Sequence, residues 1–259
     1  MKPLLRTPDQ IGLRYDDVQL SSRDGTQLHA WWLPASKDPS ATILFIHGNA
    51  ENISTHIASV MWLPAEGVNV LLLDYRGYGQ SGGVPTIAGA IEDVQAGLDY
   101  LAASSVPVIV LGQSLGASLS GVAVGAENPC TREQRWPNLT AVVLDAGFSR
   151  YSKIAKEVAA GNWLTYLFQW PAAWAMPSGM DLEDAIENIS PLPVFIIHGK
   201  NDEVVPVSHA EALMRAAREP KQLLEYEGGH IQTFGLEENR QQLMAFIKSA
   251  HLPPVSICQ

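Results

Sequence analysis

The sequence predicts an α/β fold: a mostly parallel eight-stranded sheet, opened by an antiparallel N-terminal hairpin, with helices on both faces. Three observations predict it. Short, continuous apolar runs, typical of strands buried on both faces, alternate with segments of helical period. Near the N-terminus, the turn Arg23-Asp24-Gly25 separates two runs of β-forming residues. A chain of 259 residues, 46% hydrophobic and 17% charged, suits one domain over residues 1–259.

The elements follow in order along the chain. The hairpin strands are expected at residues 15–20 and 27–33. The later strands are expected at residues 42–46, 68–73, 106–111, 141–144, 194–197 and 222–226. Helical patterns cover residues 88–102, 117–123 and 238–249. Ser208 and Glu211 have the spacing of a capping box, which predicts a further helix beginning at Ser208.

One segment interrupts the alternation of strands and helices. Residues 150–188, between the sixth and seventh strands, are too long and too aromatic for a simple connection. We expect a small helical cap over the carboxyl edge of the sheet. Its aromatic residues either line a substrate-binding pocket or pack inward as a core helix. The candidate substrate-binding residues are Trp163, Phe168, Trp170 and Trp174.

Charge and composition exclude several classes of function. The net charge is −10, and no cluster of Lys or Arg offers a site for nucleic acid or anionic lipid. The N-terminus lacks the apolar stretch of a signal peptide, so we expect a cytoplasmic protein without membrane association. Two cysteines without metal-site spacing, and no H-E-x-x-H motif, predict neither a metal nor another cofactor.

The most informative motif is G-x-S-x-G at residues 112–116. A β-branched run precedes it and a small-residue helical segment follows it, which is the context of a nucleophile elbow. Ser114 would then lie on a sharp turn with its hydroxyl exposed above the sheet. Gly112 and Gly116 would remove the Cβ atoms that otherwise clash where strand and helix approach.

A serine nucleophile needs a base, and the base needs an anion to orient it. His230 follows two glycines directly after the last strand, at the edge where Ser114 also projects. Asp202, at the end of the seventh strand, is the predicted acid, and the order Ser, Asp, His fits this elbow. Asp145, at the end of the sixth strand, is the rival acid.

The tetrahedral intermediate of such chemistry also needs hydrogen-bond donors for its oxyanion. The backbone N–H of Leu115, at the start of the nucleophile helix, is one candidate. The turn after the third strand offers the second, the backbone N–H of Asn49. The Asn49 side chain has the alternative role of stabilising that turn.

A second glycine motif suggests a different function, the binding of a dinucleotide. Residues 77–82 match the dinucleotide pattern G-x-G-x-x-G after a strand. Pro85 and Thr86 separate its last glycine from the next helix, and the acidic residue at the expected distance, Asp99, lies within a helix. We therefore do not expect nucleotide binding.

Five ordered motifs give the chain a resemblance to the α/β-hydrolase family over essentially its whole length. They are residues 47–50, 74–82, 112–116, 198–202 and 229–230. The chain is most similar to bacterial serine hydrolases related to the eukaryotic α/β-hydrolase-domain depalmitoylases and lysophospholipases. The resemblance implies Ser114 as nucleophile, Asp202 as acid, His230 as base, and Asn49 and Leu115 as oxyanion donors.

The sequence therefore predicts a serine esterase that acts on a small-molecule ester with a short to medium acyl chain. A thioesterase or a peptidase-like amidase would use the same three residues. A non-catalytic protein that binds a small apolar ligand is the alternative outside the enzymes.

Overall fold

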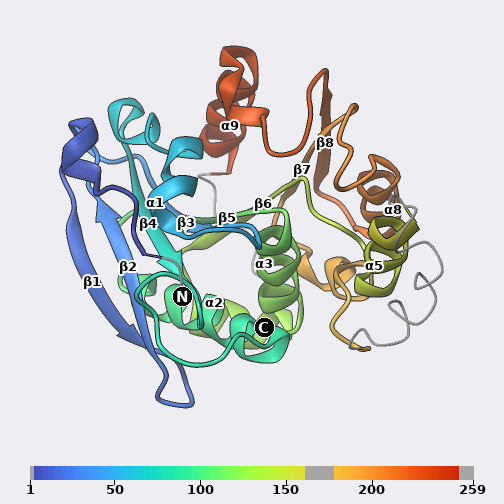
Figure 1. Cartoon of the computed structure of the whole chain (residues 1–259), viewed down its shortest axis with the longest axis horizontal. Coiled ribbons are helices and arrows are strands. Elements are labelled where there is room, and N and C mark those ends of the chain that lie inside the picture. Colours follow the sequence, from blue (N-terminus) through green and yellow to red (C-terminus); the bar gives the residue numbers. More distant parts are fainter. Residues whose placement is uncertain (1–2, 161–177, 251–259) are drawn as a thin grey trace.

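The computed structural model describes residues 3–160 and 178–250. Within them eight strands form one sheet in the order β1-β2-β4-β3-β5-β6-β7-β8 (Figure 1). β2 pairs antiparallel with β1 and β4, and every other neighbouring pair is parallel. The strands are β1 (Asp16–Ser21), β2 (Gln27–Leu33), β3 (Ala41–Ile46), β4 (Val68–Asp74), β5 (Val108–Gln113), β6 (Leu139–Asp145), β7 (Val194–Gly199) and β8 (Lys221–Tyr226).

Helices connect the strands and cover the sheet. The α-helices are α1 (Ile53–His56), α2 (Ile87–Leu101), α3 (Leu115–Gly125), α4 (Pro129–Arg135), α5 (Tyr151–Ala160), α7 (Leu182–Ala185), α8 (Ser208–Ala216) and α9 (Glu237–Ser249). The 3₁₀ turns are η1 (Pro8–Ile11), η2 (Ile57–Ser59), η3 (Leu63–Glu66), η5 (Ile186–Ile189) and η6 (Thr233–Gly235). Thr86 is the N-cap residue of α2, and its hydroxyl accepts the Gly89 N–H at 3.2 Å.

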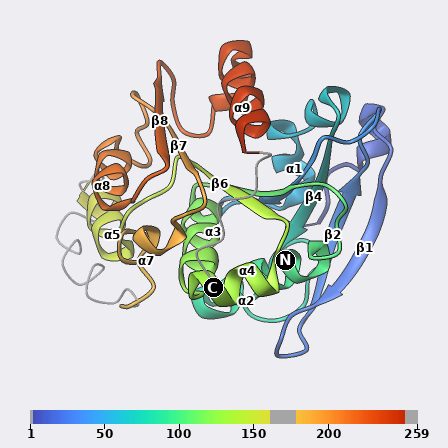
Figure 2. The same ribbon diagram turned by 180° about the vertical axis from the view of Figure 1, so that it is seen from behind.

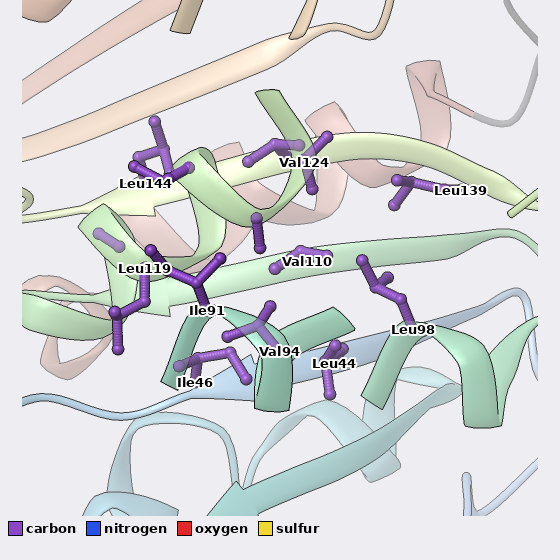
Figure 3. Packing of buried hydrophobic residues seen from close by; sticks show 14 of the residues in the cluster. Leu44, Ile46, Ile91, Val94, Leu98, Val110, Leu119, Val124, Leu139 and Leu144 are labelled. Atoms are coloured by element: carbon purple, nitrogen blue, oxygen red, sulfur yellow. The ribbon is translucent and has the colours of Figure 1, made fainter. Parts of the chain in front are cut away.

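Alternate side chains of each strand enter two separate cores, one on each face of the sheet. Leu44 and Ile46 of β3 join the core under α2, α3, α7 and α8, where Figure 3 shows Val94 of α2 beside them. Ile43 and Phe45 face the core under α1 and α9. Figure 2 shows the same two helical layers from behind. A strand buried on both faces is apolar at most positions, which explains the continuous hydrophobic runs.

The predicted fold class is confirmed, with small differences at element boundaries. The fifth strand begins at Val108 and ends at Gln113, two residues later than predicted at each end. The predicted capping box at Ser208 is wrong. Val207 is the N-cap residue of α8 and already has right-handed helical dihedrals, and no side chain caps this helix. Ser208 is therefore the first helical residue, where its side chain no longer occupies the capping position.

The predicted cap, residues 150–188, lies partly outside the described residues. Its first described part is α5, which contributes Tyr151 to a small apolar cluster near the carboxyl edge of the sheet. At its other end Leu182, Ile186 and Ile189 are buried in the core shared with α3. That end therefore packs against the body of the domain, and the cap as a unit stays a prediction.

Helix α3 lies unusually close to β3 and β5. A Cβ atom on Gly116 would lie 2.2 Å from the Ile46 carbonyl oxygen, and one on Gly112 would lie 2.3 Å from the Gly116 carbonyl oxygen. Both obstacles are backbone atoms, which cannot rotate away as a side chain can. The two glycines are therefore required for α3 to begin directly above the ends of β3 and β5.

Chain direction brings the loops after β3, β5, β7 and β8 to one edge of the sheet. β3 lies between β4 and β5 in the sheet. The connection after β3 leads to one side of β3, and the connection after β4 leads to the other side, so the strand order reverses at β3. Ligand sites of open parallel sheets lie beyond the carboxyl ends of strands at such a point. Among the helices of residues 3–160 and 178–250, none is both long enough and apolar enough to cross a membrane.

The glycine contacts predict a stability effect. Gly116→Ala should lower the free energy of unfolding by at least about 2 kcal/mol, because the added methyl group has no space beside the Ile46 carbonyl. Urea unfolding followed by circular dichroism measures this. Gly235→Ala is the matched control, since its Cβ would meet no heavy atom within 4 Å and should change stability little. Equal stabilities of the two variants would contradict the argument.

Candidate active site

Ser114 lies at the turn between β5 and α3, in a backbone conformation that few L-residues adopt. Its φ is 54° and its ψ is −119°, and its N–H donates to the Asp145 carbonyl at 2.8 Å. The turn lifts its half-buried side chain beyond the edge of the sheet. Strain of this kind persists only where the surroundings hold it, and it concentrates at functional sites.

Three distant side chains meet in one hydrogen-bonded chain. Nε2 of His230 lies 3.0 Å from Oγ of Ser114, and Nδ1 lies 2.7 Å from Oδ2 of Asp202. A carboxylate oxygen only accepts, so Nδ1 carries the hydrogen and donates it to Asp202. Nε2 of the neutral ring then accepts the serine O–H. This arrangement can remove the serine proton as the oxygen attacks.

The Asp202 carboxylate is buried but well supplied with donors. Oδ1 accepts the backbone N–H groups of Val204 at 2.9 Å and Val205 at 2.8 Å. Burial raises the pKa of Asp202, but the hydrogen bonds from His230 and these two N–H groups outweigh it and hold the pKa below 3.8. Asp202 is therefore ionised at neutral pH, as an anion beside a developing imidazolium must be.

The rival acid, Asp145, contacts neither Ser114 nor His230 through its carboxylate in the described structure. It accepts hydrogen bonds from Gln113 Nε2 at 2.7 Å and Thr233 Oγ1 at 2.6 Å. Complete burial raises its pKa to about 6, although both hydrogen bonds lower it. Asp145 thus joins the residue before Ser114 to the segment that follows His230.

The two candidate oxyanion donors flank Ser114. Leu115 is the first residue of α3, where an N–H has no carbonyl one turn earlier to bond. Asn49 lies in the β3–α1 loop (residues 47–52), which borders the serine: a Cβ on Gly48 would lie 3.3 Å from Ser114 Cβ. The Asn49 side chain accepts the Tyr78 hydroxyl at 2.7 Å, a contact with the segment after β4 rather than with its own turn.

Apolar side chains surround one side of the candidate site. Phe148, Tyr151 and Val205 form a small buried cluster, against which Leu115 and Ile154 pack. The four aromatic residues predicted to bind substrate, Trp163, Phe168, Trp170 and Trp174, lie outside the described residues. Their role stays a prediction.

Two observations concern a metal ion and a nucleotide, the ligands that the sequence did not predict. In residues 3–160 and 178–250, no group of three or more His, Cys, Asp and Glu side chains could hold a metal ion. The glycine motif at residues 77–82 packs against Asp74. A Cβ on Gly79 would lie 1.8 Å from Asp74 Oδ2, so this glycine serves packing around a buried carboxylate.

Comparison with known proteins identifies the family. A family model described as serine aminopeptidase, S33, matches residues 37–180, more than half of the chain. The uncharacterized protein YfhR of Escherichia coli K12 is 34% identical over 92% of this chain and 82% of its own. The α/β-hydrolase domain-containing protein WAV2 of Arabidopsis thaliana is 32% identical over 88% of this chain and 76% of its own. The chain belongs to the α/β-hydrolase family.

Solved structures agree on the fold of this α/β hydrolase. A Pyrococcus furiosus esterase superposes with a TM-score of 0.79 at 21% identity, covering 96% of each chain. Acetyl xylan esterase 1 from Thermoanaerobacterium gives a TM-score of 0.66 at 20% identity, covering 93% of this chain and 84% of its own. At these identities the likeness extends to the fold alone.

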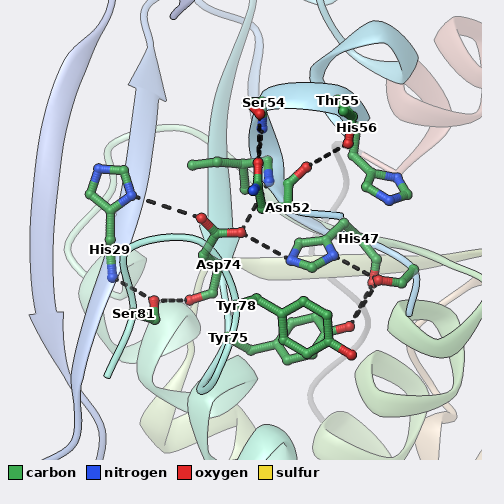
Figure 4. Close-up of polar contacts among 12 residues, drawn as sticks. His29, His47, Asn52, Ser54, Thr55, His56, Asp74, Tyr75, Tyr78 and Ser81 are labelled. Carbon is green, nitrogen blue, oxygen red and sulfur yellow. Dashed lines mark hydrogen bonds and ion pairs between the residues drawn. The ribbon is translucent and has the colours of Figure 1, made fainter. Parts of the chain in front are cut away.

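Sequence reasoning missed a set of polar residues beneath the β3–α1 loop. Asp74, His29 and His47 are buried together, and Asp74 Oδ1 lies 3.2 Å from His47 Nε2 (Figure 4). The turn that begins at His47 was expected to contribute only the Asn49 N–H. The signal that could have found the set is a charged residue, Asp74, at the end of a buried and mostly apolar strand.

The raised pKa of Asp145 predicts how stability depends on pH. A folded-state pKa of about 6, above the ordinary 3.8, means that ionisation opposes folding, so this contribution to stability falls as pH rises from 4 to 6. Asp145→Asn does not titrate. Its free energy of unfolding, relative to wild type, should rise by on the order of 3 kcal/mol between about pH 4 and about pH 8. Urea unfolding at each pH tests this, and a pH-independent difference would contradict it.

Proposed function

We propose that this α/β hydrolase is a serine esterase that cleaves carboxylic esters of short to medium acyl chain through an acyl-enzyme on Ser114. The observation that carries the proposal is the hydrogen-bonded chain from Ser114 through His230 to Asp202. It supplies a nucleophile, a base with a free lone pair directed at it, and an ionised acid that fixes the base.

The reaction follows from this geometry. Oγ of Ser114 attacks the ester carbonyl carbon while His230 Nε2 takes the hydroxyl proton, and the carbonyl oxygen becomes an oxyanion. The N–H groups of Leu115 and Asn49 stabilise that charge. The intermediate collapses, the C–O bond to the alcohol breaks, and His230 returns the proton to the leaving oxygen. Water then attacks the acyl-enzyme by the same steps and releases the carboxylic acid.

Two observations support an ester with an apolar acyl group as substrate. The buried cluster of Phe148, Tyr151 and Val205 packs around Leu115, the residue next to the nucleophile, and makes this side of the site apolar. The structural neighbours named esterases, from Pyrococcus furiosus and Thermoanaerobacterium, share the fold. The expected aromatic cap would extend the same surface.

An amidase is the second candidate, because the matching family model is described as a serine aminopeptidase. The same serine, base and acid could attack an amide or a thioester. An aminopeptidase must also bind a charged amino terminus. Apolar side chains pack against Leu115, the residue next to the nucleophile, which favours the uncharged acyl group of an ester.

The nucleophile can be tested with a fluorophosphonate probe, which labels activated serines. Wild type should be labelled and should hydrolyse p-nitrophenyl butyrate, and Ser114→Ala should lose both activities, by at least about 10³-fold in rate. Ser120→Ala is the matched control, because this buried hydroxyl of the same helix makes no hydrogen bond within the part of the chain that the structure describes. Equal labelling of wild type and Ser114→Ala would overturn the assignment, and labelling without turnover would favour a binding protein.

The acyl preference can be tested with p-nitrophenyl esters from acetate through octanoate to palmitate. We expect kcat/KM to be highest for the short and medium chains and to fall for palmitate, because the cluster around Leu115 is small. An aminoacyl p-nitroanilide and an acyl thioester, assayed beside them, separate the alternative activities. Rates that rise steadily to palmitate, or a preferred anilide, would contradict this specificity.

A further inference from the structure

The last residue of β4 and the residues that follow it contact the β3–α1 loop, and none of them takes part in the proposed reaction. Asp74 ends β4, and the two tyrosines Tyr75 and Tyr78 follow it. Figure 4 shows Asp74 between His29 and His47, with the rings of both tyrosines beside them. The contacts between this segment and the loop run from one end of the loop to the other.

Asp74 contacts residues at both ends of the loop. Its Oδ1 accepts the Ile53 N–H, just beyond the loop, at 3.0 Å and lies 3.2 Å from Nε2 of His47, where the loop begins. Burial raises the pKa of Asp74, but the contacts with His29 and His47 outweigh it and lower the pKa below 3.8. The buried Asp74 carboxylate is thus hydrogen-bonded just beyond one end of the loop, at Ile53, and lies beside His47 at the other end.

The Tyr75 hydroxyl fixes the peptide that carries the candidate oxyanion donor. It donates to the Gly48 carbonyl at 3.0 Å and lies 3.4 Å from the His47 carbonyl. Nδ1 of His47 donates to the same Gly48 carbonyl at 2.7 Å. In a planar trans peptide the C=O and the following N–H point in opposite directions. Two donors on the Gly48 carbonyl therefore determine where the Asn49 N–H points.

The Tyr78 hydroxyl fixes the next peptide. It lies 2.7 Å from Oδ1 and 3.1 Å from the backbone carbonyl of Asn49. The phenol has one hydrogen, which these two oxygens share. Asn49 is exposed, so its loop has little packing of its own to hold it, and the bond from a half-buried tyrosine limits its motion.

We propose that Tyr75 and Tyr78 are positioning residues for the oxyanion hole: Tyr75 aims the Asn49 N–H at the reacting oxygen, and Tyr78 keeps the Asn49 peptide from turning away. The inference rests on the proposed esterase function and deepens it. Stabilisation of an oxyanion depends on donors that are oriented before the charge develops. Two hydroxyls outside the hydrogen-bonded chain of Ser114, His230 and Asp202 would then contribute to the rate without contacting substrate.

The packing of Tyr75 permits a selective test. Its ring is stacked on His47, with centroids 4.5 Å apart, and lies 4.5 Å from the ring of Tyr78. Tyr75→Phe removes the hydroxyl and keeps both ring contacts. Tyr78→Phe is a second variant at a less buried position. Tyr100→Phe, an exposed tyrosine of α2, is the matched control.

In Tyr75→Phe and Tyr78→Phe, kcat for p-nitrophenyl butyrate should fall about tenfold with little change in KM, a fraction of the loss of a whole oxyanion donor. Inhibition by an arylboronic acid, which forms a tetrahedral adduct with the serine, should weaken by the same factor. A purely structural role would not make these two losses match. Tyr100→Phe should equal wild type in both measurements. Thermal unfolding of each variant checks that the folded fraction is not the cause.

The outcomes separate this inference from the proposed function. Wild type that neither labels at Ser114 nor hydrolyses esters overturns both. An active wild type whose Tyr75→Phe and Tyr78→Phe variants keep kcat and boronate affinity overturns only the role of the tyrosines. A rise in KM alone also overturns it, because the hydroxyls would then contact substrate. Should Tyr75→Phe fail to fold, Tyr78→Phe decides by the same measurements.

Discussion

The close approach of α3 to β3 is the constraint on which the candidate site depends. Gly116 has no side chain, so its backbone contacts the carbonyl groups of Ile46 and His47. This contact places Ser114 next to the β3–α1 loop, where a serine and the loop amides can act on one carbonyl group. A side chain at position 116 would separate the two, whatever the other residues of the site were.

Three buried carboxylates at this edge of the sheet have different roles because their surroundings differ. Asp202 accepts from His230 and two backbone amides and is held ionised. Asp74 is held ionised by two histidines and fixes a loop. Asp145 accepts from two neutral side chains, and its pKa is raised by burial. Only Asp202 has an oxygen within hydrogen-bonding distance of His230. Distance to His230, rather than residue type, distinguishes Asp202, the candidate acid, from Asp145.

Much of the fold and the main features of the site were predictable from local patterns. Continuous apolar runs predicted the strands because burial on both faces favours apolar residues at nearly every position of the strand. The glycine spacing around Ser114 predicted the close approach of strand and helix. Local patterns failed where the capping of a helix depended on tertiary packing. Ser208 and Glu211 have the spacing of a capping box, yet Val207 is the N-cap residue and no side chain caps the helix.

The sequence by itself determined the alternation of strands and helices and the elbow at Ser114, because these depend on residues close together in the chain. Only the tertiary structure decided which partners the buried polar groups have. Gln113 and Thr233 contact Asp145, and Tyr75 contacts the Gly48 carbonyl, across 27 to 88 positions of sequence. A buried polar group takes whichever donor or acceptor the fold brings within about 3 Å, and no local pattern encodes that distance.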